Sequence, residues 1–311
     1  MNVIEKFNPK NSLELFGYNE YFNNLGKLIF TENFPKSLLI SGDKGIGKST
    51  LIIHLLHFFF DKGNYDLKNL KILKQSKFHS QFLENTYPNI IYLSGSEYSN
   101  IKIDDIRIIK NKLLQTPIDN NKRFIIFDDV DLFNVQSLNA LLKIIEEPGN
   151  YNHFILINNN KKSLIDTLKS RCVEIKVFMN QNNYIEIINS LSKKFNQNII
   201  FDINTLATSP GNLIKYNFIF EQNKIDLSLD YLDNLKTLIN LYKKEKNIFY
   251  KELIYFFTDY HFCNLKKQNS ISNEVFITNH LNIKRKINDF FVLNLSQTSL
   301  INSLEGNIFN G

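Results

Sequence analysis

The stretch ISGDKGIGKST, from Ile40 to Thr50, decides the fold of this chain. It fits the pattern Gly-x-x-x-x-Gly-Lys-[Ser/Thr], follows the apolar run SLLI and precedes the helical pattern STLIIHLLHFFF. A strand, a glycine-rich loop and a helix in this order form a phosphate-binding loop, because backbone N–H groups and the helix N-terminus face the phosphate. A glycine-rich turn with a surface lysine is the alternative. The residues expected to bind a nucleotide are Gly42, Asp43, Lys44, Gly45, Ile46, Gly47, Lys48, Ser49 and Thr50, and the Ser49 hydroxyl is expected to reach Mg²⁺.

Composition sets the broad class of the protein. The 311 residues are 43% apolar, which is enough for two or three domains with real cores. A net charge of +6 permits an acidic partner such as nucleic acid, but no basic block stands out. Only Cys172 and Cys263 occur, so we expect neither a disulfide framework nor a four-thiolate zinc site, and both cysteines read as small buried residues. The first residues lack an apolar signal core, and a cytoplasmic setting is expected.

The pattern of apolar residues predicts an α/β first half and a helical remainder. Strands are expected at residues 37–40, 89–93, 123–127 and 153–157, where short apolar runs occur. Helical periodicity is typical of residues 104–115, with Asp104 as N-cap, and of residues 137–147. After Val177 the strand signals stop, and a break occurs near residues 224–228. The expected domains are residues 1–176, 177–225 and 226–311.

A second chemical motif is FIIFDDVD, an apolar strand that ends in acidic residues. A carboxylate at such a strand end, beside a phosphate-binding loop, can hold Mg²⁺, and Asp128 is expected to do so. Asp129 stands where ATPases of this design usually carry a glutamate that activates water. Its side chain is one methylene shorter, about 1.5 Å by chain geometry, and a misplacement of that size can cost around 100-fold in rate. Capping of the next helix is the alternative role for Asp129 and Asp131.

Residues 128–172 carry a specific resemblance. The segments DDVDLFNVQSLNALLKIIEEP and FILINNNKKSLIDTLKSRC resemble the core of the bacterial DNA polymerase III clamp loader subunits, members of the AAA+ family. The resemblance extends from about residue 13 to residue 211 and is weak beyond. It implies an AAA+ P-loop nucleotide-binding domain with a parallel sheet, a small helical lid domain and an all-helical collar domain. It also implies ATP or ADP with Mg²⁺ as cofactors, and as partners the other clamp loader subunits (delta and gamma/tau), the sliding clamp and primer-template DNA. Many relatives insert a four-cysteine zinc module after the first helix; no cysteine lies there in this chain, so we predict no zinc.

Three further residues take their expected roles from the resemblance. Asn158 is at the family's sensor 1 position, where a polar side chain faces the nucleotide, although a turn residue is the alternative. Gly211 is at the sensor 2 position, where active members carry an arginine. Arg171 corresponds to the arginine that acts in trans on the nucleotide of a neighbouring subunit, since a guanidinium suits a phosphoryl transition state; a surface ion pair is its alternative role.

Three functions remain open from the sequence. The first is a clamp loader stator, a subunit that binds ATP with little or no turnover of its own. The second is the clamp loader's ATPase motor subunit, against which Asp129 and Gly211 count. The third is a P-loop nucleotide kinase, which would need an arginine-rich lid. His54 and His57 are spaced as metal ligands, but we interpret them as packing or solvent-facing residues because no third ligand is evident. The aromatic run at residues 249–262 favours a core or a subunit interface over a DNA-stacking surface.

Overall fold

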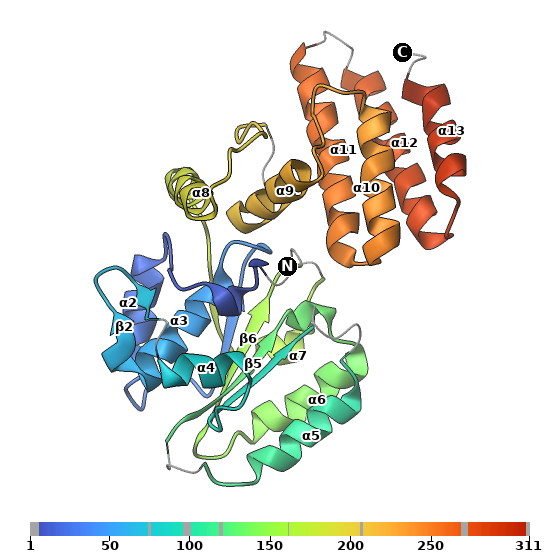
Figure 1. Cartoon of the computed structure of the whole chain (residues 1–311). Helices are drawn as coiled ribbons and strands as arrows, with labels where there is room; N and C mark the ends of the chain where they lie inside the picture. Colours follow the sequence, from blue (N-terminus) through green and yellow to red (C-terminus); the bar gives the residue numbers. More distant parts are fainter. Residues whose placement is uncertain are drawn as a thin grey trace. The chain divides into compact units, whose positions relative to one another are not determined.

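A five-stranded parallel sheet lies at the centre of the first of two units into which the chain divides (Figure 1). The computed structural model describes residues 6–73, 76–95, 101–117, 121–160, 162–205, 208–268 and 273–308. The first unit comprises Met1–Lys194 with Ser209–Asn212, and the second comprises Phe195–Thr208 with Leu213–Gly311. The three-domain division stays a prediction.

The sheet has the strand order β4-β5-β6-β1-β7. Its strands are β1 (Ser37–Ser41), β4 (Ile90–Ser94), β5 (Arg123–Asp128), β6 (Asn152–Asn158) and β7 (Val173–Lys176). The four predicted strands are confirmed, but β7 was not predicted. It is a short edge strand with a mostly exposed VEIK sequence, so it lacks the apolar run that marked the others. The small hairpin of β2 (Tyr65–Asp66) and β3 (Lys71–Ile72) was also missed.

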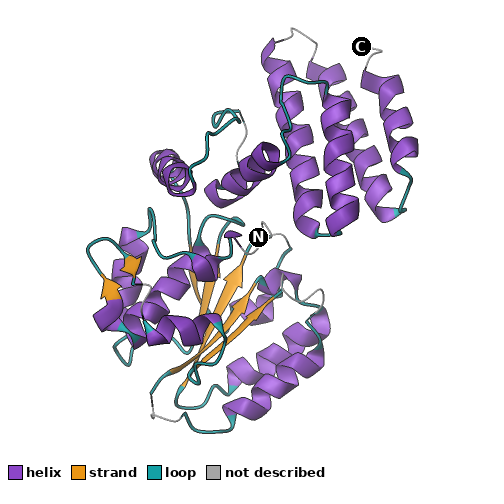
Figure 2. Ribbon diagram, in the orientation of Figure 1, coloured by secondary structure: helices purple, strands orange, loops and turns teal. Residues whose placement is uncertain are grey.

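Helices cover both faces of the sheet (Figure 2). One face packs on α2 (Asn19–Leu28), α3 (Lys48–Phe60) and α4 (Lys77–Leu83), and the other on α5 (Ile103–Leu113), α6 (Val135–Glu146) and α7 (Asp166–Lys169). Strand alternation divides the two cores, since Leu38 and Ile40 face the first and Leu39 faces the second. The remaining elements of this part are the 3₁₀ turns η1 (Pro9–Asn11), η2 (Lys62–Asn64) and η3 (Val130–Leu132), and helix α8 (Gln181–Phe195).

The predicted N-cap of α5 is wrong. The helix begins at Ile103, after Lys102, whose N–H donates to Asp105 at 2.8 Å. Asp104 lies in the first turn instead, where it pairs with Arg107 at 2.9 Å. Lys102 is the N-cap, and Asp105 satisfies its N–H from the third helical position, so the contact that was expected of a capping aspartate comes from within the helix.

The second unit is helical, with α9 (Pro210–Gln222), α10 (Tyr231–Glu245), α11 (Ile248–Gln268), α12 (Asn273–Val292) and α13 (Gln297–Ile308). The aromatic run on α11 forms its core, because Phe256, Phe257 and Tyr260 are buried. The interpretation of this run as core is thereby confirmed. On the other side of α11, Asp259 pairs with His280 and Lys284 of α12 at 2.7 and 2.9 Å.

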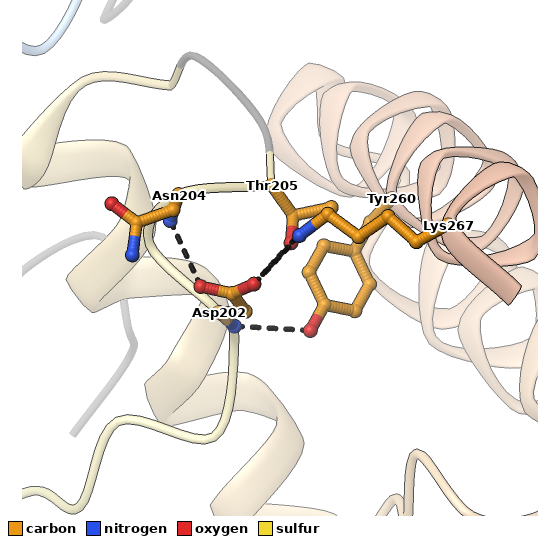
Figure 3. A network of polar contacts seen from close by, with 5 residues as sticks. All are labelled: Asp202, Asn204, Thr205, Tyr260 and Lys267. Atoms are coloured by element: carbon orange, nitrogen blue, oxygen red, sulfur yellow. Dashed lines mark hydrogen bonds and ion pairs between the residues drawn. The ribbon is translucent and has the colours of Figure 1, made fainter.

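A polar network ties the segment before α9 to the end of α11 (Figure 3). The Asp202 carboxylate accepts from Lys267 at 2.8 Å and from the Thr205 hydroxyl at 2.6 Å. The Asp202 N–H donates to the Tyr260 hydroxyl at 3.0 Å. These contacts hold the pKa of Asp202 well below its usual range, chiefly through the hydrogen bond from Lys267. Residues 202–205 are therefore fixed to α11 within the second unit.

The histidines and cysteines differ in their burial. His54 and His57 are buried and hydrogen-bonded within the core, so their interpretation as packing residues is confirmed. Cys172 and Cys263 are only half-buried, so the prediction that they are buried is wrong. Within the described ranges, no helix is long and apolar enough to cross a membrane.

Candidate functional site

The phosphate-binding loop has the local structure that its sequence predicts. The loop joins β1 to α3, and the helix begins at Lys48 directly after Gly47. Gly45 has a φ of +82°, a conformation that favours glycine because other residues meet a steric penalty there. Within the loop Asp43 is exposed and Ile46 is buried, and Lys44, Ser49 and Thr50 are half-buried.

Lys48 is buried at the base of the loop. Its amine donates to the carbonyls of Gly42 at 2.8 Å and Asp43 at 2.7 Å, and to the Asn159 side-chain oxygen at 2.7 Å. Burial lowers the pKa of Lys48 to about 8, although the nearby aspartates oppose this shift. Every partner is a neutral oxygen, so an anionic phosphate would be a stronger acceptor for this amine.

Asp128 ends β5 beside the start of α3. Burial raises the pKa of its carboxyl to about 6, and the charge of Asp129 adds to the shift. The hydroxyls of Tyr92 and Ser49 donate to this carboxylate and oppose the shift. The Ser49 hydroxyl and the Asp128 carboxylate are therefore adjacent hard oxygen donors, the type of ligand that Mg²⁺ prefers, and a cation there would offset the repulsion between the aspartates. These residues fit the predicted Mg²⁺.

Asp129 and Asp131 position the loop that follows β6. Asp129 has a left-handed backbone (φ 54°) and accepts from the Ser94 hydroxyl at 3.3 Å and from the Asn159 side-chain amide. Asp131 accepts from the Asn159 N–H at 3.1 Å. Neither side chain caps α6, whose N-cap is Asn134. Asn159 thus joins the acidic strand end to Lys48.

The structure directs Asn159, and not Asn158, toward the loop lysine. The Asn158 side chain bonds to Asn160 at 2.8 and 3.0 Å instead, on the side of Ser41. Residues 158–160 are all asparagine, so matching the motif by sequence could not tell which of them faces Lys48. Side-chain alternation along β6 was the available signal, because neighbouring residues of a strand point to opposite faces.

The segment Ser209–Asn212 packs against the phosphate-binding loop. The Gly211 N–H donates to the Gly45 carbonyl at 3.2 Å, and a Cβ at position 211 would lie 2.7 Å from that oxygen. The Tyr18 hydroxyl donates to the Ile46 carbonyl nearby. Position 211 therefore has no room for any side chain without a backbone shift, and this includes the arginine expected at this position in active members of the family.

Arg171 lies outside this arrangement. It follows α7, and its guanidinium pairs with Glu146 at 2.6 Å and donates to the Thr167 carbonyl at 2.9 Å. Its side chain is 38% exposed. Within one chain Arg171 is thus a surface ion pair, and the action in trans that was expected of it stays a prediction.

A parallel sheet of this order, a phosphate-binding loop after β1 and an acidic end of β5 define an AAA+ nucleotide-binding domain, here followed by helices. The family model described as DNA polymerase III, delta subunit, matches residues 17–181, which is more than half of the chain. The chain belongs to this family, and the predicted resemblance to DNA polymerase III clamp loader subunits is confirmed.

Curated relatives agree with the family. The chain is 27% identical over 160 residues to DNA polymerase III subunit delta′ of Buchnera aphidicola from Acyrthosiphon pisum, covering 51% of this chain and 48% of that protein. It is 23% identical over 178 residues to subunit tau/gamma of Haemophilus influenzae, covering 55% of this chain and 24% of that protein. A gamma subunit-related protein of Thermotoga maritima of known structure shares 15% identity at a TM-score of 0.48, over 92% of this chain and 99% of that one. The chain thus spans half or less of the length of these two curated relatives.

Proposed function

We propose that this chain is the delta′ subunit of the bacterial DNA polymerase III clamp loader. In this role it binds ATP or ADP with Mg²⁺ but turns ATP over slowly. It stands as a stator in a hetero-oligomeric ring with delta and gamma/tau subunits. The ring loads the sliding clamp onto primer-template DNA. The family match and the delta′ relative support this complex.

The grouping of Lys48, Ser49 and Asp128 supports nucleotide binding. Lys48 would hold the outer phosphates, and Ser49 and Asp128 would hold the Mg²⁺ that neutralises them. The N–H groups of the loop and the start of α3 would contribute their dipoles. A bound Mg²⁺ would neutralise charge at the phosphates, and Ser49 and Asp128 would position it.

The contact between Gly211 and Gly45 carries the stator proposal. An arginine at this position would supply positive charge to the phosphates, and the close backbone approach excludes it. Asp129 supports the same conclusion, since its short carboxylate is already held by Ser94 and Asn159. A loop that binds nucleotide beside a weak hydrolytic site is what a stator requires.

Arg171 is proposed to act on the nucleotide of a neighbouring subunit. Its guanidinium is exposed and always charged, and its partner Glu146 is itself 45% exposed. An exposed ion pair of this kind is worth at most about 1 kcal/mol, so exchange of Glu146 for a phosphoryl group costs little.

The experiment compares reconstituted clamp loader complexes that carry Arg171→Ala, Lys48→Ala or no change. We expect Arg171→Ala to assemble but to lose hydrolysis at the interface that the arginine faces, by about 10³- to 10⁵-fold at that site, together with most clamp loading. Lys48→Ala should leave clamp loading close to normal, because the proposal places the decisive ATP hydrolysis at neighbouring subunits and not at the phosphate-binding loop of this chain. An ATPase assay in the presence of DNA and clamp measures hydrolysis, and a clamp-loading assay measures loading.

Arg107→Ala is the matched control, because Arg107 is also an exposed arginine paired with a carboxylate. It should leave both assays unchanged. If Lys48→Ala abolishes loading while Arg171→Ala has no effect, the roles are reversed and the chain is a motor subunit. Turnover by the isolated chain on the order of 10 per second would lead to the same conclusion.

A further inference from the structure

A cavity lined mostly by polar side chains lies at the carboxyl ends of β6, β1 and β7. Its volume is about 560 Å³, within the range of roughly 300 to 1,000 Å³ for small-molecule sites. The cavity touches the nucleotide loop only at Gly42 and extends away from it, toward α7 and the edge strand. Its lining residues are Ser41, Gly42, Asn158, Asn160, Lys162, Ser163, Leu164, Lys169, Glu174, Lys176 and Phe178.

The cavity carries a net positive charge. Lys162, Lys169 and Lys176 line it against one carboxylate, Glu174, which leaves a charge of +2. Glu174 and Lys176 are two residues apart on β7, so both side chains point to the same face of the sheet. Lys169 reaches the cavity from α7, and its contact with Asp166 is long, at 3.7 Å, and exposed. Lysines that converge from three segments favour an anion in the space between them.

An aromatic side chain stands at the rim. Phe178 is 72% exposed, although most large apolar side chains of this unit are buried. Its backbone is held in place, since the Phe178 N–H donates to the Tyr21 hydroxyl at 3.2 Å and that hydroxyl donates to the Lys176 carbonyl at 3.3 Å. An exposed ring on a fixed backbone is a suitable platform for a planar base.

We propose that this cavity binds a nucleoside phosphate, with phosphate oxygens on the three lysines and the base against Phe178. The side chains of Asn160 and Ser163 supply further polar contacts within the lining. The ligand is either a free nucleotide or one nucleotide of a single strand, since both present the same base and phosphate. This site meets the nucleotide loop only at Gly42, and it does not depend on the proposed clamp loader function.

The test uses the full chain with Lys48→Ala, which removes the contribution of the nucleotide loop. Calorimetric titration with dTMP and anisotropy with a fluorescein-labelled oligo(dT) compare the two sources of ligand. We expect at least one of them to bind. Reversing the charge of two lysines, by Lys162→Glu together with Lys176→Glu, should weaken binding by about 100-fold, because each charge-assisted contact contributes about a factor of ten to the affinity. The change Lys77→Glu, at an exposed lysine that begins α4, is the matched control and should have no effect.

Phe178→Ala separates the roles of base and phosphate. It should weaken dTMP binding by about tenfold and leave the binding of inorganic pyrophosphate unchanged. Hydrogen exchange of the unaltered chain, with the loop saturated by Mg-ADP, should show added protection at residues 176–178 when dTMP is present. The proposal is overturned if neither ligand binds the Lys48→Ala chain and no protection appears. It is also overturned if the lysine reversal binds as tightly as the control.

Discussion

At the scale of single residues, one backbone contact carries the proposal that this chain is a stator. Gly211 approaches the Gly45 carbonyl so closely that a Cβ would lie 2.7 Å from it. Asn159 has a comparable influence, because it joins Lys48 to Asp129 and Asp131. The loop motif by itself gives no sign of either contact.

Replacing Gly211 with arginine should not restore a motor. We expect Gly211→Arg and Gly211→Ala to lower the free energy of unfolding by about 1 to 3 kcal/mol and to weaken ATP binding, because the new side chain must displace backbone at the loop. Urea unfolding and nucleotide titration of the full chain measure the two effects. The control is Gly63→Ala, since a Cβ there meets no atom within 4 Å. An increase of ATP turnover to the motor range in Gly211→Arg would contradict the claim that the contact with Gly45 leaves no room for an arginine at position 211.

At the scale of elements, the packing of α3 on α4 is a site of acid sensitivity. The His57 Nε2 lies 3.0 Å from the His79 Nδ1, and the His54 Nδ1 lies 2.9 Å from the Tyr65 hydroxyl. Burial lowers the pKa of His54 to about 3 and that of His57 to about 4, although Asp61 opposes the shift at His57. Both rings are therefore neutral in the folded chain at pH 7.

Stability should fall as pH drops below 6.5. The two histidines take up protons near pH 6.5 in the unfolded chain, but only near pH 4 (His57) and pH 3 (His54) in the folded chain. The contribution of each ring to stability is therefore complete above pH 6.5 and is lost progressively as the pH falls toward its folded pKa. The expected slope is about 1.4 kcal/mol per pH unit for each ring. Asp128 has the opposite sign, because its raised pKa favours the folded chain as it takes up a proton near pH 6.

Comparison with His57→Phe isolates the histidine effect from that of Asp128. Phe78 and Phe82 already pack on this ring, so a phenyl group fits the surroundings. Urea unfolding at pH 6.5 and 5.0 should show a shallower loss of stability in the variant than in the natural chain. Equal slopes for the two proteins would show that His57 does not titrate as described.

At the scale of the whole molecule, we propose that the helical unit contributes to the ring of subunits. Ile277 and Leu281 are 53% and 61% exposed and lie four residues apart on α12, so they share one helix face. Exposed apolar side chains at such spacing are typical of a protein interface. Together with the expected collar domain, residues 226–311, they mark where neighbouring subunits would pack.

Substitution of this face is a sharper test than truncation. A cut after residue 224 would separate α9 from α11, where Phe220 contacts Phe257 and Tyr216 contacts Phe256. Leu281→Asp should instead leave the chain folded and lower its incorporation into the clamp loader by tenfold or more. Co-purification with gamma and delta subunits measures incorporation. Leu114→Asp, at an apolar residue that is 79% exposed in the first unit, is the control. Full incorporation of Leu281→Asp would exclude this face from the collar.

The sequence by itself determined the phosphate-binding loop, four of the five parallel strands and the family. These features depend on local order, since a strand, a glycine-rich loop and a helix follow one another within a few residues, and buried strands carry continuous apolar runs. The same reasoning could not find β7, because an exposed edge strand needs no apolar run and its hydrogen bonds come from β1.

Only the tertiary structure decided which of three consecutive asparagines faces Lys48, and that Gly211 lies against Gly45. Both depend on contacts between residues far apart in the sequence: 111 positions separate Lys48 from Asn159. Likewise, the lysines of the cavity at the ends of β6, β1 and β7 come from a loop, a helix and an edge strand that the sheet brings together. Local patterns fix which element forms, whereas the direction of a side chain is set by the elements packed around it.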